Sequence, residues 1–196
     1  PLSIGISPVL AMYQYMRFWR CFWETLGCRV VMNNETDDSI RDEALRVSRS
    51  DFCYPVKIAL GHASIVSKRE DIDALFIPAH ISDRLQKNGL PRVFCPYVIS
   101  YASVVSSLNL GKPVLSPTID FRRNERFNTE GLFRMLEHYG YSMTEIRRAY
   151  RSAMKAHLSF QRDRFIRGKE IVDSVSESGK PAIVFFGRPY NLYDNR

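Results

Sequence analysis

The sequence has few cysteines and no long apolar segment. Its 196 residues include four cysteines, none spaced as Cys-x-x-Cys, which argues against a disulfide framework and leaves reduced thiols or metal ligands. No segment reaches the roughly 18 apolar residues that a membrane helix needs, and the N-terminus has no basic segment of a signal peptide. We therefore expect a cytoplasmic protein without a membrane partner.

The common phosphate-binding and hydrolase motifs are also missing. Gly5-Ile6-Ser7-Pro8 follows a predicted strand but lacks the further glycines of a dinucleotide-binding loop, and no Gly-Lys-Ser or Gly-Lys-Thr occurs. Neither a nucleophile elbow nor a zinc-protease helix is present. These absences exclude the usual dinucleotide and ATP loops and the common hydrolase sites.

The composition is that of a folded, basic domain. The sequence is 45% hydrophobic and 12% aromatic, and its net charge of +7 favours acidic partners. Many of the basic residues lie in one predicted long helix. Such a helix usually presents a basic face to solvent, and the alternative is that this face docks an acidic partner. Nucleic-acid binding is disfavoured because the charge lies on one helix and the sequence shows no recognised nucleic-acid-binding fold. The basic residues gather in one predicted helix: Arg147, Arg148, Arg151, Lys155, Arg162, Arg164, Arg167 and Lys169.

Short apolar strands alternate with helical patterns, which predicts a Rossmann-like, doubly wound α/β fold with a mostly parallel sheet and flanking helices. We expect residues 1–125 to form this α/β domain. Residues 126–196 would form a long helical connection and the incomplete start of a second α/β lobe. We predict strands at 3–6, 29–32, 74–77, 92–94, 112–115 and 182–186, and helices at 12–26, about 38–47, 56–68, 98–108, 130–139 and 144–176.

Two cysteines stand in matching contexts. Cys53-Tyr54-Pro55 enters a predicted helix, and Cys95-Pro96 leaves a predicted strand. A sulfur just before a helix N-terminus faces unpaired N–H groups, which favours the thiolate that binds metals. The alternative is that both are small buried residues. Zinc with His62 and His80 as further ligands is disfavoured because the spacing fits no known finger.

The other candidates are less specific. Cys21 lies within the aromatic helix and Cys28 follows its end, so both read as packing residues. His62, after Gly61, either lines the same pocket as the two cysteines or has its ring nitrogens satisfied locally.

The order of several motifs resembles the uncharacterised domain of large CoA-substrate-specific enzyme activases, which is itself similar to 2-hydroxyacyl-CoA dehydratase and benzoyl-CoA reductase subunits. The resemblance spans nearly the whole chain. Its most specific parts are Cys-Tyr-Pro-x-Lys-x-x-x-Gly-His and the terminal Gly-Arg-Pro-Tyr. The residues that carry it are Ile4-Gly5-Ile6, Pro8, Phe18-Trp19, Leu26-Gly27, Cys53 to Lys57, Gly61-His62, Phe76-Ile77-Pro78, Cys95-Pro96 and Gly187-Arg188-Pro189-Tyr190.

This resemblance implies a site. A four-iron four-sulfur (4Fe-4S) cluster would be held by Cys53 and Cys95, with Lys57, His62 and Arg188 around the cofactor or facing a substrate. Two thiolates cannot hold such a cluster alone, so the remaining ligands would come from downstream sequence, a partner chain or a small molecule.

The resemblance also implies partners. ATPase domains of the same polypeptide would drive low-potential electron transfer, and an acyl-CoA dehydratase is the other expected partner. The ATPase segments are absent here, so this chain alone is expected neither to bind ATP through them nor to act as an enzyme. The alternative function is a cofactor-free Rossmann-like module that docks one of these partners through its basic helix. The acyl-CoA served and self-association into a homo-oligomer are left open.

Overall fold

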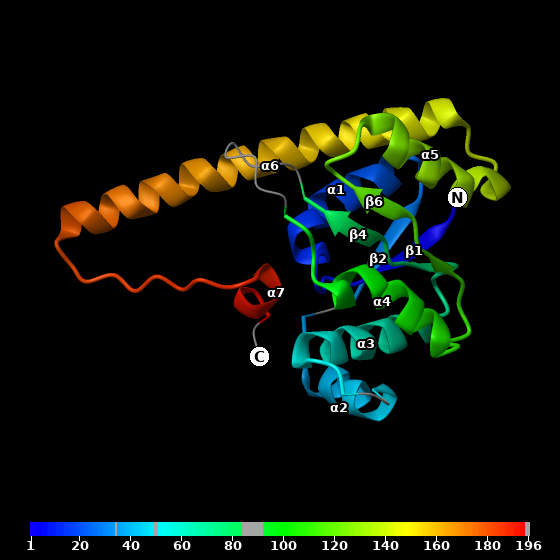
Figure 1. The fold of residues 1–196 in the computed structure, drawn as a ribbon, viewed down its shortest axis with the longest axis horizontal. Coiled ribbons are helices and arrows are strands. Elements are labelled where there is room, and N and C mark those ends of the chain that lie inside the picture. Colours follow the sequence, from blue (N-terminus) through cyan, green and yellow to red (C-terminus); the bar gives the residue numbers. More distant parts are fainter. Residues whose placement is uncertain (34, 49–50, 84–91, 195–196) are drawn as a thin grey trace.

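The computed structural model describes residues 1–33, 35–48, 51–83 and 92–194 and shows an α/β fold with a four-stranded parallel sheet (Figure 1). The sheet order is β2-β1-β3-β5, so the chain moves to one side of β1 and then to the other. This order confirms the Rossmann-like, doubly wound class. The strands are β1 (Ser3–Ile6), β2 (Arg29–Met32), β3 (Ala74–Phe76) and β5 (Val114–Leu115).

The sheet continues past β3 and β5 as a second, two-stranded parallel ladder. It consists of β4 (Ala79–Ser82) and β6 (Thr118–Asp120). Pro78 and Pro117 separate the two ladders, yet Ala79 N still donates to the carbonyl of Pro117 at 2.9 Å. The prolines therefore bend the paired strands without separating them, and β4 and β6 are additions to the predicted strands.

Helices cover both faces of the sheet (Figure 1). Helix α1 (Met12–Thr25) lies on one face, and α3 (Tyr54–Ser67) and α4 (Pro96–Ser107) lie on the other. Helix α2 (Asp38–Val47) packs on the outside of α3 and begins where the Asp37 side chain accepts a hydrogen bond from Ile40 N. The predicted helices are present, and α3 and α4 each begin two residues earlier than expected because proline fits the first helical turn.

The core is built around the aromatic face of α1. Trp19 and Trp23 pack edge-on against Phe76 of β3, and Phe18 packs against Tyr150 on the opposite side. Tyr150 belongs to α6 (Met143–Ser178), which packs along α1. Helix α5 (Glu125–Leu136) and a short 3-10 turn, Glu137–Tyr139, precede α6, and α5 packs against it. The first part of α6 thus belongs to the same hydrophobic core as the sheet.

Helix α6 is 36 residues long and leaves the body of the molecule (Figure 1). It begins with the predicted capping box, in which Ser142 and Glu145 bond each other's backbone N–H groups. The side chains from Leu158 to the end are almost all outside the core, and Gly168 does not interrupt the helix. The chain then turns at Gly179 and returns to the body, where it forms α7 (Pro189–Leu192).

The prediction of a strand at 182–186 is wrong for this structure. The segment lies outside the described sheets, and the exposed fractions of Ile183 and Phe186 are 83% and 92%. A strand needs a neighbour to pair its backbone groups, and no described strand lies beside this one. Residues 92–94 likewise form only an isolated bridge between Val93 and Ser82.

Among the described residues, no helix combines the length and the apolar character needed to cross a lipid bilayer.

Candidate functional site

Cys53 and Cys95 occupy the same structural position in two helices. Cys53 is the N-cap residue of α3, and Cys95 is the N-cap residue of α4. In each case the cysteine has an extended backbone, and its carbonyl accepts hydrogen bonds from the N–H groups three and four residues later. Both side chains therefore lie at the positive ends of helix dipoles, as the sequence predicted.

The two helix N-termini lie close together. The rings of Phe52, which precedes Cys53, and Tyr97, which follows Cys95 by two residues, meet edge-on with their centroids 5.6 Å apart. Further along, the Tyr101 hydroxyl on α4 donates to the Ala59 carbonyl on α3 at 2.5 Å. The structure thus places both cysteines on one edge of the molecule, which we call the thiol rim. Tyr97 was not identified from the sequence because no spacing rule links it to Phe52.

The surroundings of Cys95 change the acidity of its thiol. Burial by itself raises the pKa of Cys95, but hydrogen bonds from the backbone N–H groups of Tyr97 and Val98 and from the Arg188 guanidinium outweigh it. The pKa of Cys95 is therefore below its ordinary value, which favours the thiolate. Cys53 is exposed to solvent, and Cys95 is half-buried.

The other predicted site residues divide into two groups. Lys57 lies one turn after Cys53 on α3, with its Nζ 3.9 Å from the Asp51 carboxylate, and Arg188 lies close enough to Cys95 to lower the pKa of its thiol. The structure thus brings Lys57 and Arg188 to the thiol rim. His62 lies nine residues beyond Cys53 on the same helix, a rise of roughly 13 Å, and does not reach the rim.

His62 is buried and bonded through both ring nitrogens. Asn33 Nδ2 hydrogen-bonds to His62 Nδ1, and Thr36 Oγ1 lies 3.0 Å from His62 Nε2. Burial lowers the pKa of His62 to about 4, against the opposing charges of Asp194 and Asp37. Its nitrogens are satisfied within the protein, and its assignment as a cofactor-binding group stays a prediction.

The histidine and cysteine side chains do not assemble a zinc site. Within the described ranges, no group of three or more His, Cys, Asp or Glu side chains is placed to hold a metal ion. His80 is buried in the core, where Trp19 Nε1 donates to its Nε2 at 3.1 Å. Cys28 Sγ lies 3.0 Å from Tyr141 Oη, and Cys21 is half-buried beside Thr25.

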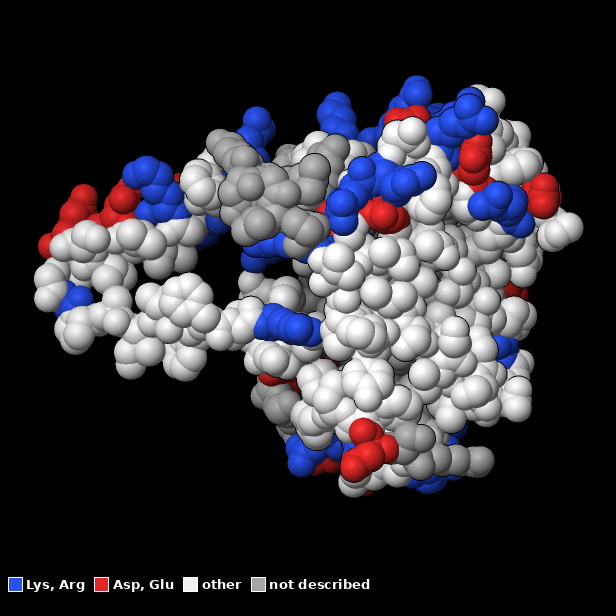
Figure 2. Space-filling view, viewed as in Figure 1, with Lys and Arg blue, Asp and Glu red and all other residues white. Residues whose placement is uncertain are grey.

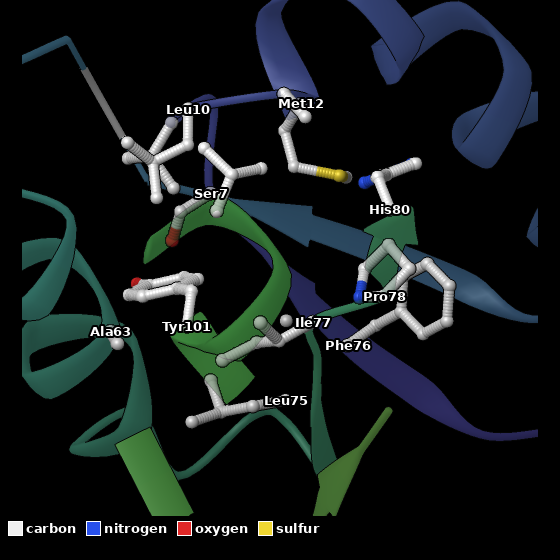
Figure 3. A pocket seen from close by; sticks show the side chains of 14 residues that line it. Ser7, Leu10, Met12, Ala63, Leu75, Phe76, Ile77, Pro78, His80 and Tyr101 are labelled. Atoms are coloured by element: carbon white, nitrogen blue, oxygen red, sulfur yellow. The ribbon is translucent and has the colours of Figure 1, made fainter. Parts of the chain in front are cut away.

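A second candidate location is the crevice where β1 and β3 diverge, at the carboxyl ends of the strands (Figure 3). Doubly wound sheets commonly bind ligands there. Here the crevice is closed by apolar side chains from α3 and α4, and its free volume of about 20 Å³ holds about one water molecule. The hydroxyl of Tyr101 and the Nε2 of His80 already have protein partners. The thiol rim is therefore the more open site for a ligand.

The chain matches a known protein family over nearly its whole length. Residues 3–196 match the family model described as the CoA enzyme activase uncharacterised domain. No curated protein matches the chain. The match therefore covers both helices that carry the thiol rim and the returning segment that carries Arg188.

Proposed function

Because this chain belongs to the family of the CoA enzyme activase uncharacterised domain, we propose that it holds part of an iron–sulfur site and takes part in ATP-driven, low-potential electron transfer. The observation that carries the proposal is the pair of free cysteines at two adjacent helix N-termini. If the two cysteines served only to pack the core, there would be no reason for both to lie at helix N-termini. Cys53 in particular is exposed and contributes little to the core.

The donor set fits two corners of a 4Fe-4S cluster. Thiolates are the ligands of such clusters, and the lowered pKa of Cys95 favours that form. When bound, the cluster would accept and release single electrons. The half-buried ring of Phe52 borders the site and would restrict its access to water, which affects the reduction potential. Because no third side-chain ligand stands nearby among the described residues, the others would come from elsewhere in the polypeptide, a partner or a small molecule.

The proposed partners follow from the family. ATPase domains of the same polypeptide would supply the energy of ATP hydrolysis, and an acyl-CoA dehydratase would receive the electrons. In this scheme the present domain contributes the electron-carrying site and its surroundings, which include the positive charges of Lys57 and Arg188. Those charges would also face an anionic substrate or partner group at the rim.

Anaerobic iron loading tests the proposal. The full-length polypeptide, reconstituted with iron and sulfide, is expected to be brown and to contain stoichiometric iron and sulfide. Cys53→Ala and Cys95→Ala should each lose most of the iron, because each removes one of only two ligands at the rim. Cys21→Ala is the matched control, since Cys21 lies away from the rim on α1 beside Thr25. A colourless, iron-free wild-type protein would count against the cluster.

The basic surface of α6 supports a second candidate, a cofactor-free module that docks a dehydratase or an ATPase domain. Lys and Arg side chains line the edge of the molecule over α6 (Figure 2). Some are neutralised by neighbours, since Arg151 binds Glu125 at 2.9 Å and Lys169 binds Asp173. Arg147, Arg148 and Lys155 are exposed, which leaves them accessible to an acidic partner.

Charge reversal distinguishes this candidate from the first. Changing Arg147, Arg151 and Lys155 together to Glu is expected to abolish association with the partner in a pull-down assay, because six units of charge change on one helix face. Cys53→Ala should leave association intact if docking is the whole function. The opposite pattern, with the thiol variant losing the partner, would reject the docking module.

A further inference from the structure

The segment after α6 returns to the body of the molecule and is held there by several contacts. The Tyr193 ring packs against Tyr13 of α1, with ring centroids 6.4 Å apart. The Tyr193 hydroxyl accepts a hydrogen bond from the Arg164 guanidinium at 2.8 Å. Tyr190 is half-buried against the hydrophobic core. These contacts anchor α7 to the body after the excursion along α6 (Figure 1).

The Gly-Arg-Pro-Tyr motif places one side chain at a defined position. Arg188 is the residue just before α7, and Pro189 begins the helix. The Arg188 guanidinium donates to the Tyr190 hydroxyl at 2.7 Å and lies beside the Cys95 thiol, whose pKa it lowers. A tyrosine that is packed against the core thus holds the guanidinium, which in turn lies beside the sulfur. The motif joins the last part of the sequence to the N-terminus of α4.

We propose that Arg188 is a positioning residue for Cys95, which holds the sulfur at the rim and places a fixed positive charge beside whatever that sulfur binds. The proposal deepens the proposed function and rests on it only for the identity of the bound group. Arginine suits this role because its guanidinium is always charged and has several N–H donors, so it serves Tyr190 and Cys95 together.

The proposal has a consequence for a bound cluster. Positive charge and N–H hydrogen bonds to a ligand sulfur stabilise the reduced, more negative state of an iron–sulfur cluster. Arg188 would therefore raise the reduction potential of a cluster held by Cys95. A residue that served only to anchor α7 would leave this potential unchanged.

The first experiment needs no metal. Methanethiosulfonate reagents form a mixed disulfide with a thiolate and release methanesulfinate, and they exist in anionic and cationic forms of similar size. Mass spectrometry of the full chain gives the rate at which each reagent modifies Cys95. Both rates are proportional to the same thiolate fraction, so the ratio of the anionic to the cationic rate depends on the local charge. By Coulomb's law at contact distance in water, Arg188→Gln should shift the ratio about tenfold toward the cationic reagent. Arg188→Lys should keep most of the wild-type ratio, and Cys21 serves as the internal control.

The second experiment uses the reconstituted protein. Arg188→Gln is expected to make the cluster about tenfold harder to reduce, which is ~59 mV for a one-electron couple. Arg188→Lys should lie closer to wild type. Equal reagent ratios at Cys95 in all three proteins, with circular dichroism showing that each is folded, would overturn the proposal. If the ratio shifts but wild type assembles no cluster, Arg188 keeps its role at Cys95 and the iron–sulfur function fails.

Discussion

Between pH 6.5 and pH 4 the domain is expected to lose about 6 kcal/mol of its free energy of unfolding, because two buried histidines resist protonation in the folded state. Burial lowers the pKa of His62 to about 4 and that of His80 to about 3, from an ordinary value of 6.5. The unfolded chain therefore binds more protons over this range, so stability falls as the pH falls. Each histidine contributes about 3 kcal/mol of this loss at pH 4.

Urea unfolding at a series of pH values measures this effect, with the fluorescence of the buried Trp19 and Trp23 as the signal. His62→Gln should reduce the pH dependence by about half, because glutamine can bond to Asn33 and Thr36 without titrating. His138→Gln, at an exposed histidine, is the matched control and should leave the profile unchanged. A flat profile down to pH 4 would show that the buried histidines are not kept neutral by the fold.

Replacing Gly61 by alanine is expected to lower the free energy of unfolding by about 3 kcal/mol, although alanine normally favours a helix. Gly61 lies inside α3, and a Cβ there would stand 2.4 Å from the carbonyl oxygen of Ile40 and 2.9 Å from atoms of Ala44. These atoms include the backbone of α2, which cannot move aside without separating the two helices. Valine at this position should be worse still.

Gly131 offers the matched control for this prediction. It also lies within a helix, α5, but a Cβ there would meet only the Thr118 carbonyl, at an ordinary 3.6 Å. Gly131→Ala is therefore expected to raise the free energy of unfolding by about 0.5–1 kcal/mol. Chemical denaturation of both variants gives the comparison, and a stabilising Gly61→Ala would mean that α2 does not pack as closely as the structure shows.

These two predictions explain part of the Cys-Tyr-Pro-x-Lys-x-x-x-Gly-His motif. Cys53 and Lys57 lie at the thiol rim. Gly61, which has no side chain, allows α2 to pack closely against α3, and His62 is hydrogen-bonded to the segment after β2. One helix thus carries chemistry at its N-terminus and packing further along. The sequence alone does not show this division, because the residues at the rim and the packing residues belong to one continuous motif.

Local patterns predicted most of the fold. The strands β1, β2, β3 and β5 are short apolar runs between turn signals, and the Ser142 and Glu145 capping box marks the start of α6. The local patterns failed where a strand pairs with residues that are far away in the sequence. Pro78 reads as a strand end, although the ladder continues beyond it through the carbonyl of Pro117. The apolar run at 182–186 has strand character, but composition cannot supply the neighbouring strand that it lacks here.

The site was predictable to the same extent. The proline beside each cysteine identified the two helix N-termini from the sequence. Their proximity depends on the contact of Phe52 with Tyr97, and the arrival of Arg188 depends on the path of α6 and α7. Similarly, the partners of His62 lie in the segment after β2, far from it in sequence. Such contacts follow from topology rather than from spacing.

The packing of α1 against α6 also sets the order in which the protein can fold during synthesis. Phe18 packs against Tyr150, which is synthesised more than a hundred residues later. At translation rates of about 5–20 residues per second, the side of α1 that carries Phe18 would wait roughly 6–25 seconds for Tyr150. During that interval the nascent chain exposes an apolar surface, so its production in cells should depend on chaperones that shield such surfaces until α6 emerges.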